Sequence, residues 1–550
     1  MIEGIKPVMT EPDQKDGENA LGTTAVLLQA KGLTIQSQAG VNVLSDISFH
    51  IEPGELVGVT GLSRMGTSVL LQCLAGLRKP TSGEVLIDGI SLYANLKAFS
   101  ATIGYVPAQL ALHHNLKVEE ILQDAARLRL PRSVSSQDRR QRVQTVLQMA
   151  GLTQAREQRA WHLSEVDKRR LSIAVELIGS PRLLLVEESA DPLTSFDEVQ
   201  IVLLMKELSR QGMTILHVNP RSRSAGLSNK SLFLAPGGFL AWFGPSEEAF
   251  TYLKSFLPRG VVKDLFGLQE ALEMLVNPQE REGKEWGNRF KDNSAYIKYV
   301  EDPLNNRYPD LMLQTHPLLR IRLRNSSKEK LPPPILPRAS AMQKFFLLFK
   351  RSFRLLWRDR TALLPLIVPP FVALAYFFLA SLAPLEASGL ANSPGLLVFL
   401  IVLTAAFLFQ NEIFKERVIY QRENRINSLL LPYVLSKVLL VGIWSIYQGV
   451  VWAVILALGE LAQILTGGFQ TLLPAVIGFT LASFAGGILG LLVSALSKTA
   501  ITTGWILLLT VPLLLSIIDP LNQWLVLAII SLVLIALLTG IQRRAGSIGT

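Results

Sequence analysis

Two segments of this sequence carry residues whose types and spacing suit phosphate chemistry. Gly61 and Gly66 bracket a short loop that follows the apolar run 55–61 and leads into an apolar helical stretch. In a strand–loop–helix arrangement, backbone N–H groups and the helix N-terminus surround a phosphate group. The second segment, 182–189, is an apolar run that ends in paired carboxylates. Together the two segments predict a phosphate-binding fold.

The elements that must position these residues are those of an α/β domain. Residues 26–255 alternate short apolar strands with helical segments, which is typical of an α/β core. Residues 361–550, in contrast, contain only 14 charged side chains. Six apolar stretches there approach or exceed the length needed to cross a bilayer, at 361–383, 394–414, 437–458, 472–497, 500–518 and 521–541. The predicted fold is therefore an α/β cassette followed by an all-α polytopic membrane domain with six transmembrane helices.

The distribution of lysine and arginine predicts the orientation of these spans. Basic clusters precede the first span, separate the second from the third and follow the sixth. The alternate loops, at 384–393, 459–471 and 519–520, contain neither Lys nor Arg. By the positive-inside rule, both termini are expected to be cytoplasmic. Residues 1–25 are polar and lack the apolar centre of a signal peptide, so we expect a disordered cytoplasmic tail.

Most of the net charge of +10 comes from the residues of the membrane domain and of the segment just before it. Residues 341–360 contain six basic side chains and one acidic side chain. We therefore expect membrane lipids with anionic headgroups as partners, and no nucleic acid. Residues 342–360 read as an amphipathic connecting helix in the membrane interface, joined to the cassette by a linker over 256–341. An ordinary solvated helix is the alternative.

The order of segments resembles a known family over nearly the whole chain. Residues 43–61, 103–108 and 163–189 are similar, in that order, to the nucleotide-binding domain of ABC transporters. A cassette followed by an ABC-2-type permease resembles the G-type (white-like) half-transporters, as does the segment 237–253. The linker segment 285–304 is closest to bacterial half-transporters in which an FHA module is often present. The resemblance implies a dimer in the bacterial inner membrane that uses ATP and Mg²⁺.

The first motif that the resemblance identifies, Walker A, departs from the family pattern. Gly61, Gly66 and Ser68 are retained, and Ser68 stands where the family contacts Mg²⁺. Thr67 replaces the lysine that neutralises the β- and γ-phosphates. Arg64 stands where a small residue is usual; it could supply a charge, but its bulk is expected to hinder the tight loop. We expect weak or absent binding of MgATP.

Walker B and the Q-loop also depart from the pattern. Glu187 stands at the Mg²⁺-side aspartate position, and Glu188 retains the expected general base. One additional methylene in Glu187 would misplace its carboxylate. The Q-loop glutamine aligns with Ala108, although Gln109 is adjacent.

Two further positions lack the family residue. The switch histidine aligns with Val218, and His217 stands one residue early, where we expect a strand and a structural role. The D-loop aspartate aligns with Thr194, unless the loop is shorter and Asp191 takes its place.

The signature motif shows the largest change. Leu-Ser-Gly-Gly-Gln in the family corresponds here to Leu163, Ser164, Glu165, Val166 and Asp167. Both glycines are replaced, and two carboxylates stand where the γ-phosphate of the partner's ATP would lie. At ~4–6 Å and an effective dielectric constant of ~20, this repulsion is on the order of a few kcal/mol.

The sequence therefore predicts an ABC half-transporter with a pseudo-ATPase cassette. We expect it to be the non-catalytic partner in a dimeric exporter, paired with a second half-transporter that has an intact cassette or with itself. A non-transporting structural or regulatory subunit is an alternative. A weakly active homodimeric exporter driven by ATP is another.

Overall fold

The computed structural model describes residues 25–37, 39–61, 64–187, 193–218, 226–254, 280–305, 339–358, 364–382, 394–427, 429–461, 472–496 and 537. Contacts divide the chain into two compact units. We call the unit formed by Met1–Ala108 and Gly179–Pro334 the core unit. The unit formed by Gln109–Ile178 and Ile335–Thr550 is called the helical unit.

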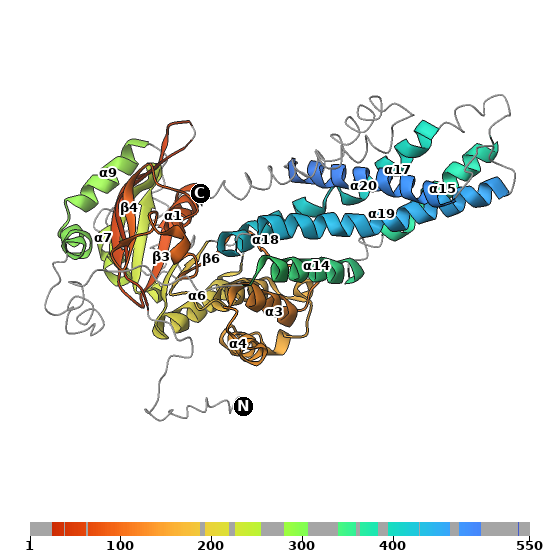
Figure 1. Ribbon diagram of the computed structural model, residues 1–550. Coiled ribbons are helices and arrows are strands. Elements are labelled where there is room, and N and C mark those ends of the chain that lie inside the picture. Colours follow the sequence, from red (N-terminus) through yellow and green to blue (C-terminus); the bar gives the residue numbers. More distant parts are fainter. Residues whose placement is uncertain are drawn as a thin grey trace, which may run out of the picture. The chain divides into compact units, whose positions relative to one another are not determined.

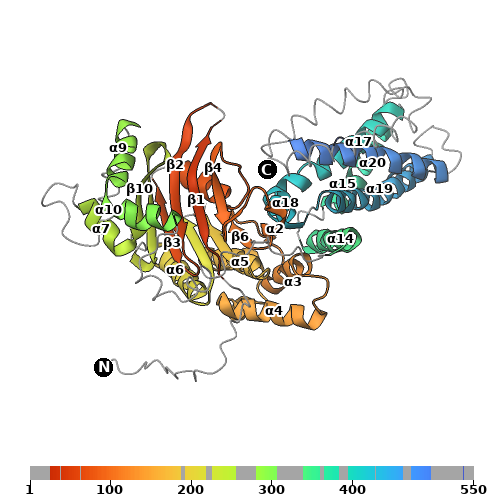
Figure 2. The same ribbon diagram turned by 60° about the vertical axis from the view of Figure 1, so that its left-hand side comes forward.

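The core unit contains two sheets (Figures 1 and 2). The six-stranded sheet has the order β10-β9-β3-β8-β7-β6, and the four-stranded sheet has the order β2-β1-β4-β5. Strands β6, β7, β8, β3 and β9 pair in parallel, whereas β10 is antiparallel to β9. The strands are β1 Leu28–Gln36, β2 Asn42–Ile51, β3 Leu56–Gly61, β4 Ser82–Ile87, β5 Ile90–Ser91, β6 Ile103–Val106, β7 Leu183–Val186, β8 Thr214–Val218, β9 Lys230–Ala235 and β10 Phe239–Pro245.

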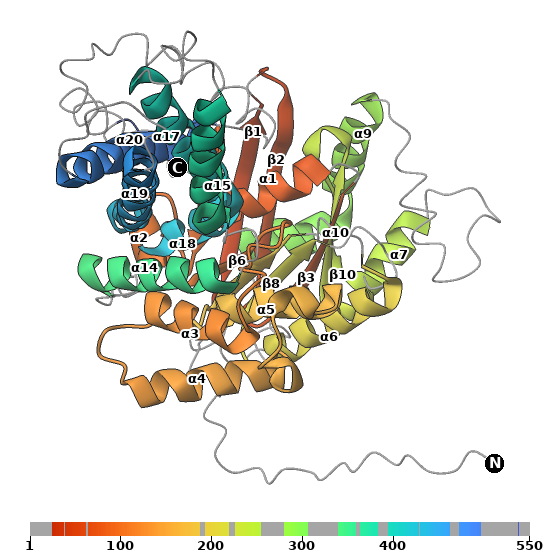
Figure 3. The same ribbon diagram turned by 90° about the vertical axis from the view of Figure 1, so that its right-hand side faces the viewer.

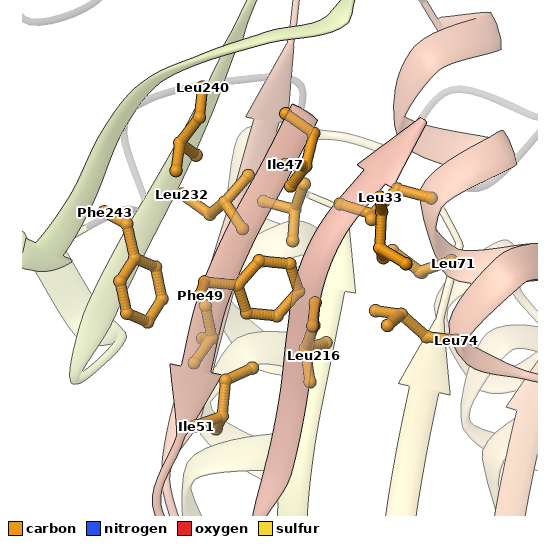
Figure 4. Packing of buried hydrophobic residues seen from close by; sticks show 14 of the residues in the cluster. Leu33, Ile47, Phe49, Ile51, Leu71, Leu74, Leu216, Leu232, Leu240 and Phe243 are labelled. Atoms are coloured by element: carbon orange, nitrogen blue, oxygen red, sulfur yellow. The ribbon is translucent and has the colours of Figure 1, made fainter. Parts of the chain in front are cut away.

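The strands of the parallel part are continuous apolar runs because both faces of the sheet are covered. Every residue of β6, β7 and β8 is buried. Figure 4 shows the packing between the two sheets and helix α1 (Arg64–Leu74), with side chains from five strands and the helix in one cluster. Its labelled members are Leu33, Ile47, Phe49, Ile51, Leu71, Leu74, Leu216, Leu232, Leu240 and Phe243. The predicted α/β cassette core is confirmed.

Several helices complete the core unit. They are α2 Leu96–Phe99, α6 Ser195–Arg210, α7 Ser246–Lys254, α9 Glu280–Lys291, α10 Ser294–Tyr296, the π-helix Ile297–Glu301 and α11 Asp302–Leu304, with a 3-10 turn at Pro236–Gly238. Part of the predicted linker is thus helical and packs on the sheet. Phe290 of α9 lies against Trp242 of β10 at 5.5 Å between ring centroids, and the Tyr299 hydroxyl donates to Glu248 at 2.5 Å.

The helical unit combines helices from two distant parts of the sequence (Figure 3). They are α3 Val118–Arg129, α4 Ser136–Met149, α5 Glu165–Leu177, α14 Ala341–Arg358, α15 Leu364–Leu382, α17 Pro394–Phe409, α18 Glu412–Asn427, α19 Leu430–Leu461 and α20 Leu472–Leu496, with 3-10 turns at Thr153–Ala155 and Ala160–His162. Within the described residues, three helical stretches are long and apolar enough to cross a membrane: Gly395–Arg425, Leu430–Leu458 and Leu473–Leu496.

The first four predicted spans correspond to helices α15, α17, α19 and α20. α15, Leu364–Leu382, is helical through Pro369 and Pro370. Apart from residue 537, the predicted spans 500–518 and 521–541 lie outside the described residues.

The segment between the second and third predicted spans, expected to be a loop, is largely helical. Its basic residues lie on helix α18, and α19 begins at Leu430 rather than at 437. Charged residues can be helical and buried here because they pair with one another. Lys437, 1% exposed, lies 3.0 Å from both Glu412 and Glu416.

Small and polar residues bring the membrane helices together. A Cβ added at Gly490 of α20 would lie 2.4 Å from the carbonyl oxygen of Ala406, and α17 therefore approaches α20 closely. Ser483 donates to the side chain of Gln448 at 2.8 Å, and Gln448 donates to the carbonyl oxygen of Ile401 at 3.3 Å. These bonds link α20, α19 and α17.

Candidate functional site

The Walker A segment lies where β3 meets α1 in the core unit. Gly61 ends β3, and Arg64 begins α1. Thr67, at the lysine position, is only 2% exposed. A Cβ added at Gly61 would lie 2.8 Å from the methyl carbon of Thr67, so this methyl group packs over the glycine backbone. The position that the sequence resemblance assigns to the lysine therefore holds a buried, uncharged side chain. Ser68 is half-buried on the same helix.

The Walker B carboxylate of Glu187 is directed towards its own protein neighbours. Glu187 follows β7 and is 5% exposed. It accepts hydrogen bonds from the Tyr105 hydroxyl at 2.5 Å, the backbone N–H of Ala108 at 3.1 Å and the side-chain amide of Gln72 at 3.3 Å. These donors come from β6, the Q-loop position and α1. Glu188 lies outside the described residues.

The other predicted site residues of the core unit lie at the Q-loop, at the end of β8 and at the start of α6. Gln109, next to Ala108, is exposed. His217 lies on β8, as predicted, with its ring Nε2 3.1 Å from the Ser228 hydroxyl. Burial lowers the pKa of His217 to about 4, so the ring is neutral at pH 7. Val218 ends β8 at the switch position.

The D-loop position lies at the start of α6. Thr194 caps this helix by accepting from the backbone N–H of Asp197 at 3.2 Å. Asp191 lies outside the described residues.

The signature segment lies at the start of α5 in the helical unit. Ser164 is the N-cap: its hydroxyl accepts from the backbone N–H of Asp167 at 3.2 Å and donates to the Asp167 carboxylate at 2.9 Å. Glu165 pairs with Lys168 at 2.6 Å, and Asp167 pairs with Arg170 at 3.2 Å. The positive end of this helix is thus compensated by the protein's own carboxylates. Leu163 is buried and Val166 is half-buried.

The sequence interpretation missed a network of ion pairs in the helical unit. Helix α14 lies beside α3 and α18 (Figure 3). Arg354 of α14 donates to Asp124 of α3 at 2.5 Å, and Arg358 of α14 donates to Glu120 of α3. Arg351 donates two hydrogen bonds to Glu423 of α18, at 2.7 and 3.0 Å.

The basic face of α14, which we expected to meet lipid headgroups, has partners within the protein. Three basic residues of α14, Arg351, Arg354 and Arg358, pair with acidic side chains of the protein. The spacing offered a signal. Glu120 and Asp124 stand four residues apart, as do Arg354 and Arg358, so both pairs lie on one face of a helix. The opposite face of α14 is different: Phe346 and Phe353 are exposed apolar side chains.

A second buried pair joins α3 to α5. Arg129 donates to both carboxylate oxygens of Glu176, at 2.8 and 2.6 Å, and Arg425 of α18 lies 4.0 Å away. Burial opposes ionisation of Glu176, but the Arg129 guanidinium outweighs it and lowers the pKa of this carboxyl group. Helix α5, which begins at the signature, is therefore joined to α3 by the buried pair of Glu176 and Arg129. The same carboxylate lies close to Arg425 of α18.

Comparison with protein families gives two matches in chain order. Residues 44–191 match the family described as ABC transporter, and residues 343–518 match the family described as ABC-2 type transporter. The first match contains the Walker A, signature and Walker B segments. The second begins in α14 and extends beyond α20.

Individual proteins match over different lengths. The ABC transporter ATP-binding/permease protein Rv1747 of Mycobacterium tuberculosis is 26% identical over 503 residues, which are 88% of this chain and 53% of that protein. The broad substrate specificity ATP-binding cassette transporter ABCG2 of Rattus norvegicus is 33% identical over 233 residues, which are 41% of this chain and 35% of that protein. ABC transporter G family member 22 of Arabidopsis thaliana is 31% identical over 230 residues, which are 40% of this chain and 30% of that protein. The chain thus spans about half the length of the first relative and about a third of the others.

Proposed function

This chain belongs to the ABC transporters, as a half-transporter with an N-terminal cassette followed by an ABC-2 type membrane domain, and we propose that it is the non-hydrolysing partner in a dimeric exporter. Its partner would be a second half-transporter with an intact cassette. The two cassettes would share their nucleotide sites, and the membrane domains would form the pathway together.

The observation that carries this proposal is the chemistry at the Walker A lysine position. Thr67 is buried, uncharged and packed against Gly61. Phosphate transfer depends on positive charge beside the β- and γ-phosphates. The signature supports the same proposal, since the Ser164 hydroxyl is used to cap its own helix and Glu165 and Asp167 add negative charge. Binding of ATP with Mg²⁺ at this half of the site is therefore proposed to be weak.

The helical unit supports a role in transport rather than in folding alone. The signature helix α5 is linked through Glu176 to α3, and α3 is linked through Asp124 and Glu120 to α14. A movement of the signature helix in the dimer can thus reach the membrane helices through one buried and two partly buried ion pairs. The proposed partner would supply the hydrolysis that drives such a movement.

Affinity purification from native membranes tests the proposal. The tagged full-length chain should co-purify in equal amounts with one other half-transporter whose Walker A contains lysine, and the complex should release phosphate from ATP. Purification as a homodimer that hydrolyses ATP would favour the homodimeric exporter instead. Co-purification with a complex that contains no other transporter would favour a structural or regulatory subunit.

The proposed topology places both termini in the cytoplasm of a bacterial inner membrane. We expect a cysteine introduced by Ser388→Cys, in the 384–393 loop, to react with a membrane-impermeant maleimide in intact cells. A cysteine introduced by Ala339→Cys, just before α14, should react only after permeabilisation. The native Cys73 is buried, and burial raises the pKa of its thiol to about 11, so it gives little background. The reverse labelling pattern would contradict the topology.

A further inference from the structure

The Glu187 carboxylate joins three parts of the core unit that ABC proteins use around nucleotide. We propose that Glu187 is a latch that fixes the Q-loop to the Walker B strand without nucleotide. This inference rests on the proposed function, because a cassette that does not hydrolyse ATP has no need to release its Q-loop during a cycle.

The contacts of the two carboxylate oxygens define the latch. One oxygen accepts from the Tyr105 hydroxyl at 2.5 Å and from the Gln72 side-chain amide at 3.3 Å. The other oxygen accepts from the backbone N–H of Ala108 at 3.1 Å. The carboxylate is nearly excluded from water, where hydrogen bonds to a charged acceptor are stronger than those between neutral groups.

The replacement of aspartate by glutamate explains why this bond can form. The backbone at Glu187 is already fixed, since its N–H donates to the carbonyl oxygen of Val106 at 2.9 Å. From that anchored position, a side chain shorter by one methylene would withdraw the carboxylate by about 1.5 Å. An aspartate would then leave the Ala108 N–H beyond hydrogen-bonding distance in this arrangement.

The location of Ala108 determines which part of the backbone the latch holds in place. Ala108 is the last residue of the core unit before the chain enters the helical unit at Gln109. Pro107 precedes it and has no backbone N–H, so Ala108 supplies the first donor after strand β6. Holding this N–H restricts the backbone where the two units are connected. The Q-loop is therefore set by the protein's own carboxylate in place of a nucleotide-dependent contact.

Hydrogen–deuterium exchange of the full-length protein in nanodiscs, without nucleotide, tests the latch. Peptides that span 106–109 report mainly on the amides of Ala108 and Gln109. In Glu187→Asp, exchange at Ala108 should be about tenfold to a hundredfold faster than in the wild type, since a bond to a charged acceptor is lost. Tyr105→Phe, which removes one hydroxyl that orients the carboxylate, should give a smaller increase. Addition of MgATP should leave the wild-type exchange unchanged.

A matched control separates this effect from general destabilisation. Tyr93 also donates a partly buried hydroxyl within the core unit, to the carbonyl oxygen of Cys73 at 2.7 Å. Tyr93→Phe should leave exchange at Ala108 unchanged. Equal exchange at Ala108 in Glu187→Asp and Tyr93→Phe would overturn the latch, as would a wild-type Q-loop whose exchange slows on addition of MgATP. Because the variants are compared without nucleotide, detection of ATP hydrolysis would overturn the proposed function and leave this comparison intact.

Discussion

The substitution Thr67→Lys is expected to leave the purified protein without measurable ATP hydrolysis. Restoring the lysine returns a positive charge to Walker A, yet it repairs one of several defects. We expect steady-state phosphate release to remain more than about a hundredfold below ~1 per second, the lower end of ordinary enzyme turnover.

The reason lies in the composite nature of ABC sites that the family resemblance implies. Each site joins the P-loop and Walker B of one subunit to the signature of the other. In a homodimer, Thr67→Lys would still face a signature in which Glu165 and Asp167 repel the γ-phosphate and Ser164 caps its own helix. Beside a competent partner, the site that contains the repaired P-loop still contains Glu187 of Walker B, whose carboxylate is bonded to Tyr105 and Ala108. Groups that act together in catalysis are strongly non-additive, so partial repair recovers little.

The control for this experiment is the double variant Thr67→Lys/Glu188→Gln, which lacks the expected general base. Phosphate release by Thr67→Lys should equal that of the double variant. Robust hydrolysis by Thr67→Lys that disappears in the double variant would show that the signature and Q-loop changes are tolerated. The pseudo-ATPase proposal would then be wrong.

The substitution Glu423→Leu is expected to destabilise the helical unit by about 3–5 kcal/mol, because it leaves Arg351 buried without its carboxylate. The two side chains are only 5% and 10% exposed, and two hydrogen bonds join them. A guanidinium keeps its proton at neutral pH, so Arg351 cannot escape this penalty in the variant by becoming neutral. Thermal unfolding in detergent should show a Tm lower by roughly 6–20 °C.

Two further variants make this prediction specific. Arg351→Met/Glu423→Leu removes both charges and should recover most of the lost stability, since an apolar pair of similar volume replaces a buried ion pair well. Glu285→Leu breaks an ion pair with Arg289 whose side chains are 57% and 41% exposed, and it should change stability by less than about 1 kcal/mol. A Glu423→Leu protein as stable as Glu285→Leu would contradict the buried ion pair.

Local patterns were sufficient to predict the elements of the cassette and of the first membrane helices. The strand 55–61 and the run that ends in Glu187 became β3 and β7, because continuous apolar runs are stable only where both faces of a sheet are covered. The apolar stretches near 394, 437 and 472 became α17, α19 and α20 for the equally local reason that a bilayer requires long apolar helices. The proposed replacement of the Walker A lysine and of the signature glycines likewise depends on residue identity alone, and it stays a prediction from the sequence.

The partners of the charged residues depended on the three-dimensional arrangement. Spacing showed that Arg351, Arg354 and Arg358 share one face of α14, but it did not show that acidic side chains from α3 and α18 meet that face. Those acids are separated from the arginines by 72 to 238 positions along the chain. The same is true of Glu187, whose direction is set by donors 79 and 82 residues earlier. Periodicity records which side of an element is polar, whereas the partner of a buried charge is fixed by the packing of elements that are distant in sequence.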